Sequence, residues 1–119
     1  MKHILIILSV LMSISIAHAD TKVSGKKVFK RCVSCHSFTK TKIGPPLGNI
    51  FDKKAGSVIG FKYSKPMKNS DIIWNDCTLY KFLKKPRKHI KGTKMRFSGL
   101  KMKSHSAPLI KYVKEHQVK

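Results

Sequence analysis

Acidic residues are scarce in this sequence. Its 119 residues include five Asp and Glu against 26 Lys and Arg, which gives a net charge of +21. The lysines are spread over the whole length rather than gathered in a tail, which is typical of a basic shell around a folded domain. A field of this sign attracts negative partners, such as an acidic protein surface, an anionic membrane face or nucleic acid.

Long hydrophobic runs are absent as well. The longest run, from Ile4 to Ile16, has 13 residues with three serines among them, whereas a membrane span needs about 20 predominantly apolar residues. Lys2 before this run and Ala17-His18-Ala19 after it predict a cleaved secretory signal over residues 1–19 and a periplasmic protein. The alternative is an uncut signal that tethers the protein to the membrane by its N-terminus.

Repeats, low-complexity blocks and linkers are also missing after the signal. Residues 20–119, about 100 residues, fit one small domain. Large aliphatic residues are few in this part, and a cofactor within the core would make up for the shortage. The apolar positions follow helical rather than alternating spacing, so the sequence predicts an all-α domain.

The first half of the domain is expected to contain one helix and a long loop. Ser24 can cap a helix that carries Val28, Phe29 and Cys32 on one face. Glycines and prolines then interrupt residues 38–68, which predicts loops and short turns.

The second half is expected to contain two helices. Asp71, Asn75 or Asp76 can cap a helix that Pro86 ends. An exposed segment is expected over residues 87–103. The last helix should begin near Ser104 or Ser106, with Pro108 in its first turn.

Cysteines number three, and two of them form a motif. Cys32, Cys35 and His36 fit C-x-x-C-H, the pattern of covalent haem attachment, in which two thiols add to the haem vinyl groups and the histidine binds the iron. A thioredoxin-like pair would need a βαβ surrounding, which the sequence does not predict. Zinc would need four ligands, and Cys77 is the only further cysteine. A disulfide would close a strained, very small loop.

A sixth iron ligand can come from Met67, Met95 or Met102. Met95 stands out because it lies in a polar, glycine-containing segment, residues 91–97, where a thioether would otherwise have no partner. A neutral thioether favours ferrous iron and raises the reduction potential.

A series of short stretches follows a recognisable order along the domain. They are Gly25, Phe29, Cys32 to His36, Gly44 to Leu47, Gly60 to Ser64, Trp74, Lys85 to Ile90, Gly92 to Met95, Phe97, Gly99, Leu100, Leu109 and Tyr112. In this order they resemble the class I c-type cytochromes, that is, mitochondrial-type cytochrome c and its bacterial relatives. The resemblance covers nearly all of the domain over residues 20–119. It implies the small cytochrome c fold, with helices and long loops wrapped around one covalent haem.

The resemblance also implies roles for individual residues. His36 and Met95 are the axial iron ligands, and Cys32 and Cys35 form the two thioethers of one haem c. The four further haem contacts are the Pro45 carbonyl as acceptor for the His36 ring, Tyr63 and Trp74 as donors to a propionate, and Thr93 in the methionine loop.

Three departures from the family pattern lie near these residues. Phe82 replaces the tyrosine that hydrogen-bonds the methionine sulfur. Met67 stands where asparagine is frequent, and Lys91 where proline is. The segment from His36 to Gly44 is three residues shorter than in animal and plant members, which shortens a surface loop.

The function that follows is that of a soluble one-electron carrier between a bc-type complex and a terminal oxidase. Two filled axial positions leave no substrate site, so no enzyme activity is expected. The alternative is a ligand-binding or sensing haem protein with a labile Met95. A basic nucleic-acid or zinc module would also fit the charge, but the export signal and the order of the motifs count against it.

The expected partners are acidic docking surfaces on membrane redox complexes, with peripheral membrane contact, no nucleic acid and a monomeric state. Cys77 is expected to be a small unpaired hydrophobe, with a disulfide-linked dimer as its alternative. Six lysines are expected around the exposed haem edge as the docking patch: Lys40, Lys42, Lys88, Lys91, Lys94 and Lys101.

Overall fold

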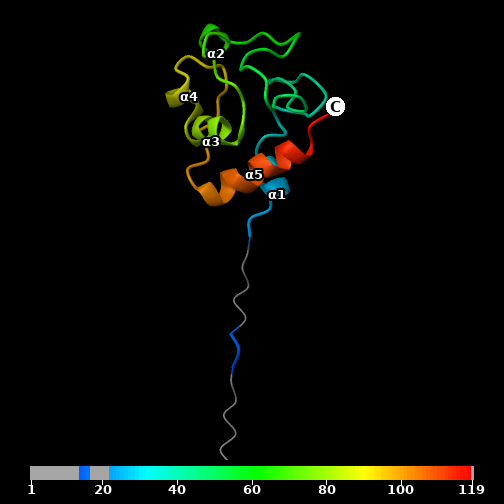
Figure 1. Cartoon of the computed structure of the whole chain (residues 1–119), viewed down its shortest axis with the longest axis vertical. Helices are drawn as coiled ribbons and strands as arrows, with labels where there is room; N and C mark the ends of the chain where they lie inside the picture. The colour runs from blue at the N-terminus through cyan, green and yellow to red at the C-terminus, as the bar shows by residue number, and fades with distance from the viewer. Residues whose placement is uncertain (1–13, 17–21, 119) are drawn as a thin grey trace, which may run out of the picture.

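Helices and long loops make up the described part of the chain in the computed structural model, which describes residues 14–16 and 22–118 (Figure 1). That part contains no strand, only one isolated antiparallel bridge between Lys54 and Ile73. The predicted all-α class is thus confirmed. The helices are α1 (Gly25–Phe29), α2 (Lys65–Lys68), α3 (Asp76–Lys84), α4 (Pro86–His89) and α5 (Lys103–Glu115).

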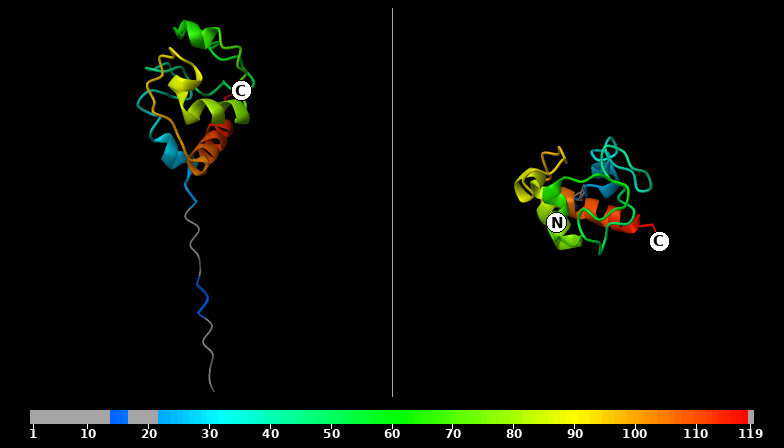
Figure 2. Two further views of the ribbon diagram at one scale, coloured as in Figure 1. Left: turned by 90° about the vertical axis from the view of Figure 1, so that its left-hand side faces the viewer. Right: turned by 90° about the horizontal axis from the view of Figure 1, so that it is seen from above.

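The two terminal helices α1 and α5 cross at the base of the molecule (Figures 1 and 2). The Ser24 side chain accepts the Lys27 amide and caps α1, as the sequence predicts. Gly25 lies directly against α5, because a Cβ there would collide with the Pro108 carbonyl. The close approach lets the rings of Phe29 and Tyr112 meet at 5.3 Å between centroids.

Helix α3 begins with a reciprocal cap. The Asn75 side chain accepts the Thr78 amide, and the Thr78 hydroxyl accepts the Asn75 amide, each at 2.9 Å. Leu79 and Phe82 are buried on its inner face. Helix α3 ends before Pro86, which is the first residue of α4. At this position no helical hydrogen bond needs the N–H that proline lacks.

Three local predictions were wrong in detail. Helix α1 ends at Phe29, so the C-x-x-C-H motif lies in the turns that follow it. Helix α5 begins at Lys103, one residue before Ser104, but Ser106 lies inside it, fully buried, and the N-cap residue Met102 makes no side-chain hydrogen bond to cap it. Pro108 consequently lies inside α5 and not in its first turn.

The segment over residues 87–103 was expected to be exposed, and this is only partly so. Ile90 and Leu100 are buried at 5% and 1% exposure. The Leu100 amide donates to the Leu83 carbonyl at 2.7 Å, which ties the segment to the end of α3. Such anchors have no helical period, so the pattern of apolar residues did not indicate them.

The predicted signal over residues 1–19 lies outside the described residues, apart from 14–16, which are exposed. Within the described part, no helix has the length and apolar character needed to cross a membrane.

Candidate cofactor site

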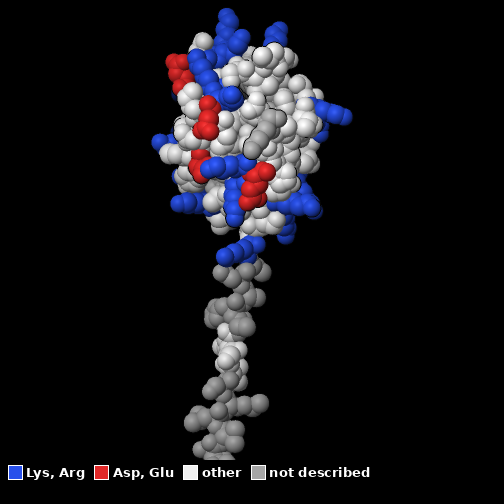
Figure 3. All heavy atoms as spheres, turned by 45° about the vertical axis from the view of Figure 1, so that its right-hand side comes forward, with Lys and Arg blue, Asp and Glu red and all other residues white. Residues whose placement is uncertain are grey.

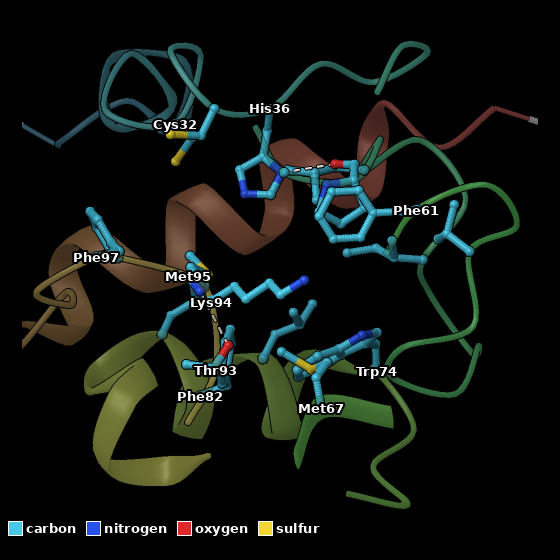
Figure 4. A pocket seen from close by; sticks show the side chains of 18 of the residues that line it. Cys32, His36, Phe61, Met67, Trp74, Phe82, Thr93, Lys94, Met95 and Phe97 are labelled. Carbon is cyan, nitrogen blue, oxygen red and sulfur yellow. Dashed lines mark hydrogen bonds between the residues drawn. The ribbon is translucent and has the colours of Figure 1, made fainter. Parts of the chain in front are cut away.

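A cavity of about 400 Å³ occupies the centre of the helical shell. Cys32 and His36 enter it from one side, and the methionine segment, Phe82, Met67 and Trp74 enter from the other (Figure 4). Its inner lining is mostly apolar, with side chains that include Leu47, Ile50, Leu79, Leu83, Leu109, Ile110 and Val113. A folded chain of this size does not ordinarily leave so large an apolar space empty.

The C-x-x-C-H motif forms tight turns at one wall. The Cys32 carbonyl accepts the amides of Cys35 at 3.1 Å and of His36 at 2.8 Å, which brings both thiols and the imidazole to the same side. The sulfurs of Cys32 and Cys35 are unpaired, and the described residues include no cluster of metal-ligating groups of the zinc type. Burial raises the pKa of the Cys32 thiol to about 11, so the thiol is neutral at pH 7.

The His36 ring is fixed by the loop that follows it. Nδ1 lies 2.8 Å from the Pro45 carbonyl oxygen, and because a carbonyl only accepts, Nδ1 carries the proton. Gly44 packs flat against the ring, where a Cβ would collide with it. Burial lowers the pKa of His36, an effect that the bond to Pro45 opposes and the nearby Lys42 reinforces. The ring is therefore neutral, with its Nε2 lone pair available as a ligand.

The methionine segment closes the opposite wall. Met95 is half-buried at the cavity, and its amide donates to the Thr93 hydroxyl at 3.3 Å. Met67, the second methionine named as a candidate ligand from the sequence, also lines the cavity and is 8% exposed. Met102 is 54% exposed and does not line it.

Tyr63 and Trp74 both line the cavity. The Tyr63 hydroxyl accepts the Val58 amide at 3.3 Å, and burial raises the pKa of this hydroxyl. Trp74 is 8% exposed, and its ring meets that of Phe82 at 5.1 Å between centroids. Both residues have a donor hydrogen left over, since neither donates from its side chain to another described residue.

Several residues at the cavity mouth were not found from the sequence. Five basic side chains and no acidic one line the cavity, namely Arg31, Lys53, Lys54, Lys94 and Arg96. The Arg31 guanidinium lies 5.1 Å from the Phe97 ring centroid, a cation–π contact across the mouth. The Lys94 ammonium donates to the Lys62 carbonyl at 3.0 Å. Lys94 was among the six lysines expected around the haem edge, whereas no motif marks the other four, because only the loop folding brings them together.

This donor set fits haem. The apolar interior suits a porphyrin plate, the basic mouth suits its two anionic propionates, and the two thiols beside a neutral imidazole suit covalent attachment and iron binding. A helical shell of this kind around a C-x-x-C-H wall defines a c-type haem protein.

Comparison with known proteins agrees. The cytochrome c family pattern matches residues 23–117. Cytochrome c type-1 of Ascaris suum is 50% identical over 95 residues, which cover 77% of this chain and 85% of that protein. Cytochrome c2 of Blastochloris viridis is 39% identical over 106 residues, which cover 87% and 84%. Among solved structures, cytochrome cH from Methylobacterium extorquens has a TM-score of 0.74 at 35% identity and covers 76% of this chain and 94% of that chain.

The chain therefore belongs to the cytochrome c family. Its cofactor is haem c, attached covalently through the C-x-x-C-H motif at Cys32 and Cys35, and it is a haem electron carrier of the kind that exchanges electrons with respiratory complexes.

Proposed function

We propose that the chain holds its haem between His36 and Met95 and carries single electrons from a bc-type complex to a terminal oxidase. The observation that carries this proposal is the position of the two side chains on opposite walls of one apolar cavity (Figure 4). Haem c supplies the exchange between ferric and ferrous iron. His36 and Met95 would both hold the iron, which would leave no iron position for a substrate, so the protein would be a carrier and not an enzyme.

The two ligands contribute differently. The 2.8 Å bond from Nδ1 to Pro45 holds the His36 ring in one orientation and makes Nε2 more basic. The Met95 thioether is a neutral, polarisable donor that stabilises ferrous iron and raises the reduction potential. The Thr93 hydroxyl orders the backbone of the methionine segment by accepting the Met95 amide.

The remaining proposed contacts serve the propionates and the attachment. Tyr63 and Trp74 donate their free hydrogens to a propionate, which compensates the cost of burying a charge. Cys32 and Cys35 fix the haem edge to the turns after α1, so the carrier keeps its cofactor between encounters.

Charge distribution supports acidic partners. Three of the four described acids pair with lysines, with distances of 2.9 Å for Lys54–Asp71, 3.4 Å for Lys114–Asp76 and 3.9 Å for Lys111–Glu115. On the face of the molecule that Figure 3 draws, acidic and basic side chains are interspersed. Of the five basic residues that line the cavity, only Lys54 is paired with an acid, so four positive charges near the haem site are left without an acidic partner among the described residues, and they speed encounters with negative surfaces.

The six lysines proposed as the docking patch, Lys40, Lys42, Lys88, Lys91, Lys94 and Lys101, are all exposed. An exported protein that begins at Asp20 would meet such complexes at the periplasmic face of the membrane. Mass measurement of the exported protein tests the cleavage after Ala19. The alternative of a ligand-sensing haem protein is not favoured by the family relationship.

The test is electron transfer with purified partner complexes at varied ionic strength. Lys101→Glu reverses a charge in the proposed docking patch, and Lys111→Glu makes the same change on α5, at an exposed lysine outside that patch. Lys101→Glu should slow the second-order rate roughly fivefold or more at low salt, with a smaller loss at high salt. Equal effects of the two substitutions would rule out docking through this patch.

A further inference from the structure

We propose that Gln117, just beyond α5, is a positioning residue for the His36 ligand. Its side-chain amide ties the loop that carries Pro45 to the end of α5. The inference rests on the proposed role of His36 as an iron ligand. Gln117 belongs to no motif that indicates haem binding.

The Gln117 amide makes four hydrogen bonds. Oε1 accepts the backbone amides of Ile50 at 2.9 Å and Phe51 at 3.2 Å. Nε2 donates to the carbonyls of Leu47 at 2.7 Å and Val113 at 3.1 Å. An amide side chain has two acceptor sites and two donor hydrogens, so its whole capacity is used. One side chain thus joins α5 to a loop 66 to 70 residues earlier.

The loop bound by Gln117 is continuous with the histidine turn. The Gly44 amide donates to the Cys35 carbonyl at 2.7 Å, and the Leu47 amide donates to the Ser37 carbonyl at 2.8 Å. The bond between His36 and Pro45 lies between these two. A fourth bond runs from the Gly48 amide to the Phe38 carbonyl at 2.9 Å, so these contacts pair residues 35–38 with residues 44–48, and Gln117 bonds the second of these segments at Leu47.

The residues before and after Gln117 in the sequence contact the same loop. The His116 ring stacks on Phe38 with centroids 4.9 Å apart and planes at 15°. The Val118 amide donates to the Gly48 carbonyl at 2.5 Å. These contacts keep the end of α5 against the loop, but only Gln117 bonds it on both sides of Gly48.

Loss of the Gln117 amide would leave its loop partners without a substitute. The Ile50 and Phe51 amides donate to no other described residue, and the Leu47 carbonyl accepts from none. Part-buried groups left unpaired favour rearrangement of the loop. Because Pro45 is two residues from Leu47, such a rearrangement would weaken the acceptor that orients His36 and lower the basicity of its ring.

The experiment compares the covalent haem protein with its Gln117→Met variant, which keeps the length of the side chain. NMR of the ferrous form follows the His36 Nδ1–H resonance and its exchange with solvent, and voltammetry gives the reduction potential. In Gln117→Met this resonance should move upfield. Its exchange should accelerate at least roughly fivefold beyond the change in the global unfolding constant, as expected for lost hydrogen bonds. The potential should rise.

Two further variants separate positioning from stability. Leu100→Ala removes a buried side chain in the segment that is bonded to the end of α3, and its His36 exchange should change only as far as its unfolding constant does. Gln117→Glu keeps the acceptor for Ile50 and Phe51 but loses the donor to Leu47 and Val113, and it puts a carboxylate oxygen against these two carbonyls. It should shift the resonance in the same direction, and it tests the inference even if Gln117→Met does not fold.

An unchanged His36 resonance and potential in both Gln117 variants would overturn the inference while leaving the proposed function intact. If the unmodified protein lacks a histidine-ligated low-spin haem, the proposed function fails instead.

Discussion

The two walls of the haem cavity are built in different ways. In the histidine wall, residues 32–48, hydrogen bonds fix both the ring of His36 and the loop that faces it. In the methionine wall, residues 90–100, the side chain of Met95 has no polar partner, and the segment is held by backbone contacts and packing.

This difference indicates where the site is rigid and where it can open. Several hydrogen bonds must break before His36 can turn, whereas Met95 can leave its place when packing loosens. Met67 and Phe82 beside it are apolar and add no hydrogen bond to the thioether. The cost of local opening should therefore be lower on the methionine side.

The largest effect on stability should come from loss of the haem, which we place between the two walls. In Cys32→Ala/Cys35→Ala the haem is not attached, and the 400 Å³ cavity must stay empty or collapse. At about 24 cal/mol per Å³ this costs on the order of 10 kcal/mol, similar to the whole stability of a domain. Circular dichroism should show an unfolded chain, whereas Cys77→Ser, at an exposed position, should fold normally. A stable fold without haem would contradict the prediction that the haem is needed to fill the cavity.

A methyl group at position 44 should disrupt the packing of the histidine wall and lower the stability of the protein. Gly44→Ala puts a Cβ into the His36 ring, and neither backbone nor imidazole can move without losing hydrogen bonds. We expect a loss of about 3 kcal/mol or more in chemical denaturation, at the upper end for overpacking. Gly60→Ala is the control, because nothing lies within 4 Å of its Cβ. Its φ of 87° makes alanine cost about 1–2 kcal/mol. Equal losses would mean that the wall is not rigid.

Removing the thioether should open the methionine wall and leave the histidine wall intact. Met95→Ala truncates a half-buried side chain, which should cost about 2 kcal/mol. It should also make the iron accessible to carbon monoxide in the ferrous form. Met102→Ala, at an exposed methionine outside the cavity, should change neither property. The optical spectrum after addition of carbon monoxide distinguishes the two variants.

A hydroxyl at position 82 should give the methionine wall a side-chain hydrogen bond, which at present only the ligand of the histidine wall has. Phe82 is 4% exposed and lines the cavity, so Phe82→Tyr can place a donor near the Met95 sulfur. One such bond is worth about 1 kcal/mol, which corresponds to roughly fivefold less local opening. Imidazole binding to the ferric protein, measured at several concentrations, should weaken by that factor. Stronger imidazole binding would show that the hydroxyl disturbs the packing instead.

The smallest effect should be a change in pH dependence at Tyr63. Burial raises the pKa of this hydroxyl above its ordinary value of 10.0. The neutral form is thus favoured in the folded state, and its contribution to stability is complete below pH 10 and is lost as pH rises through the folded-state pKa. Tyr63→Phe should therefore lose less stability than the unmodified protein above pH 10, as measured by denaturation at several pH values. Parallel curves would contradict this.

Sequence reasoning succeeded where chemistry or period is local. Cys32, Cys35 and His36 are adjacent in the chain, and the spacing of their side chains alone indicates haem. Asn75 and Ser24 cap helices through contacts three residues away, so they too could be predicted.

What the sequence did not reveal depends on contacts between distant segments. Gln117 binds a loop 66 to 70 residues earlier, and Arg31 meets Phe97 across the cavity mouth. Met67 faces the cavity because α2 lies beside it, which no helical period predicts. Leu100 looked exposed because its neighbours are polar, yet it is buried under α3 through one backbone bond.

The central claim is that one covalent haem is closed between His36 and Met95. The most direct measurement expresses the full precursor in a host that attaches haem, purifies the exported protein and records optical spectra of both oxidation states with and without carbon monoxide. If both residues hold the iron, we expect a covalent low-spin haem whose ferrous spectrum does not change when carbon monoxide is added. A spectrum that carbon monoxide shifts would contradict the closed site, and the absence of covalent haem would contradict the assignment of Cys32 to His36.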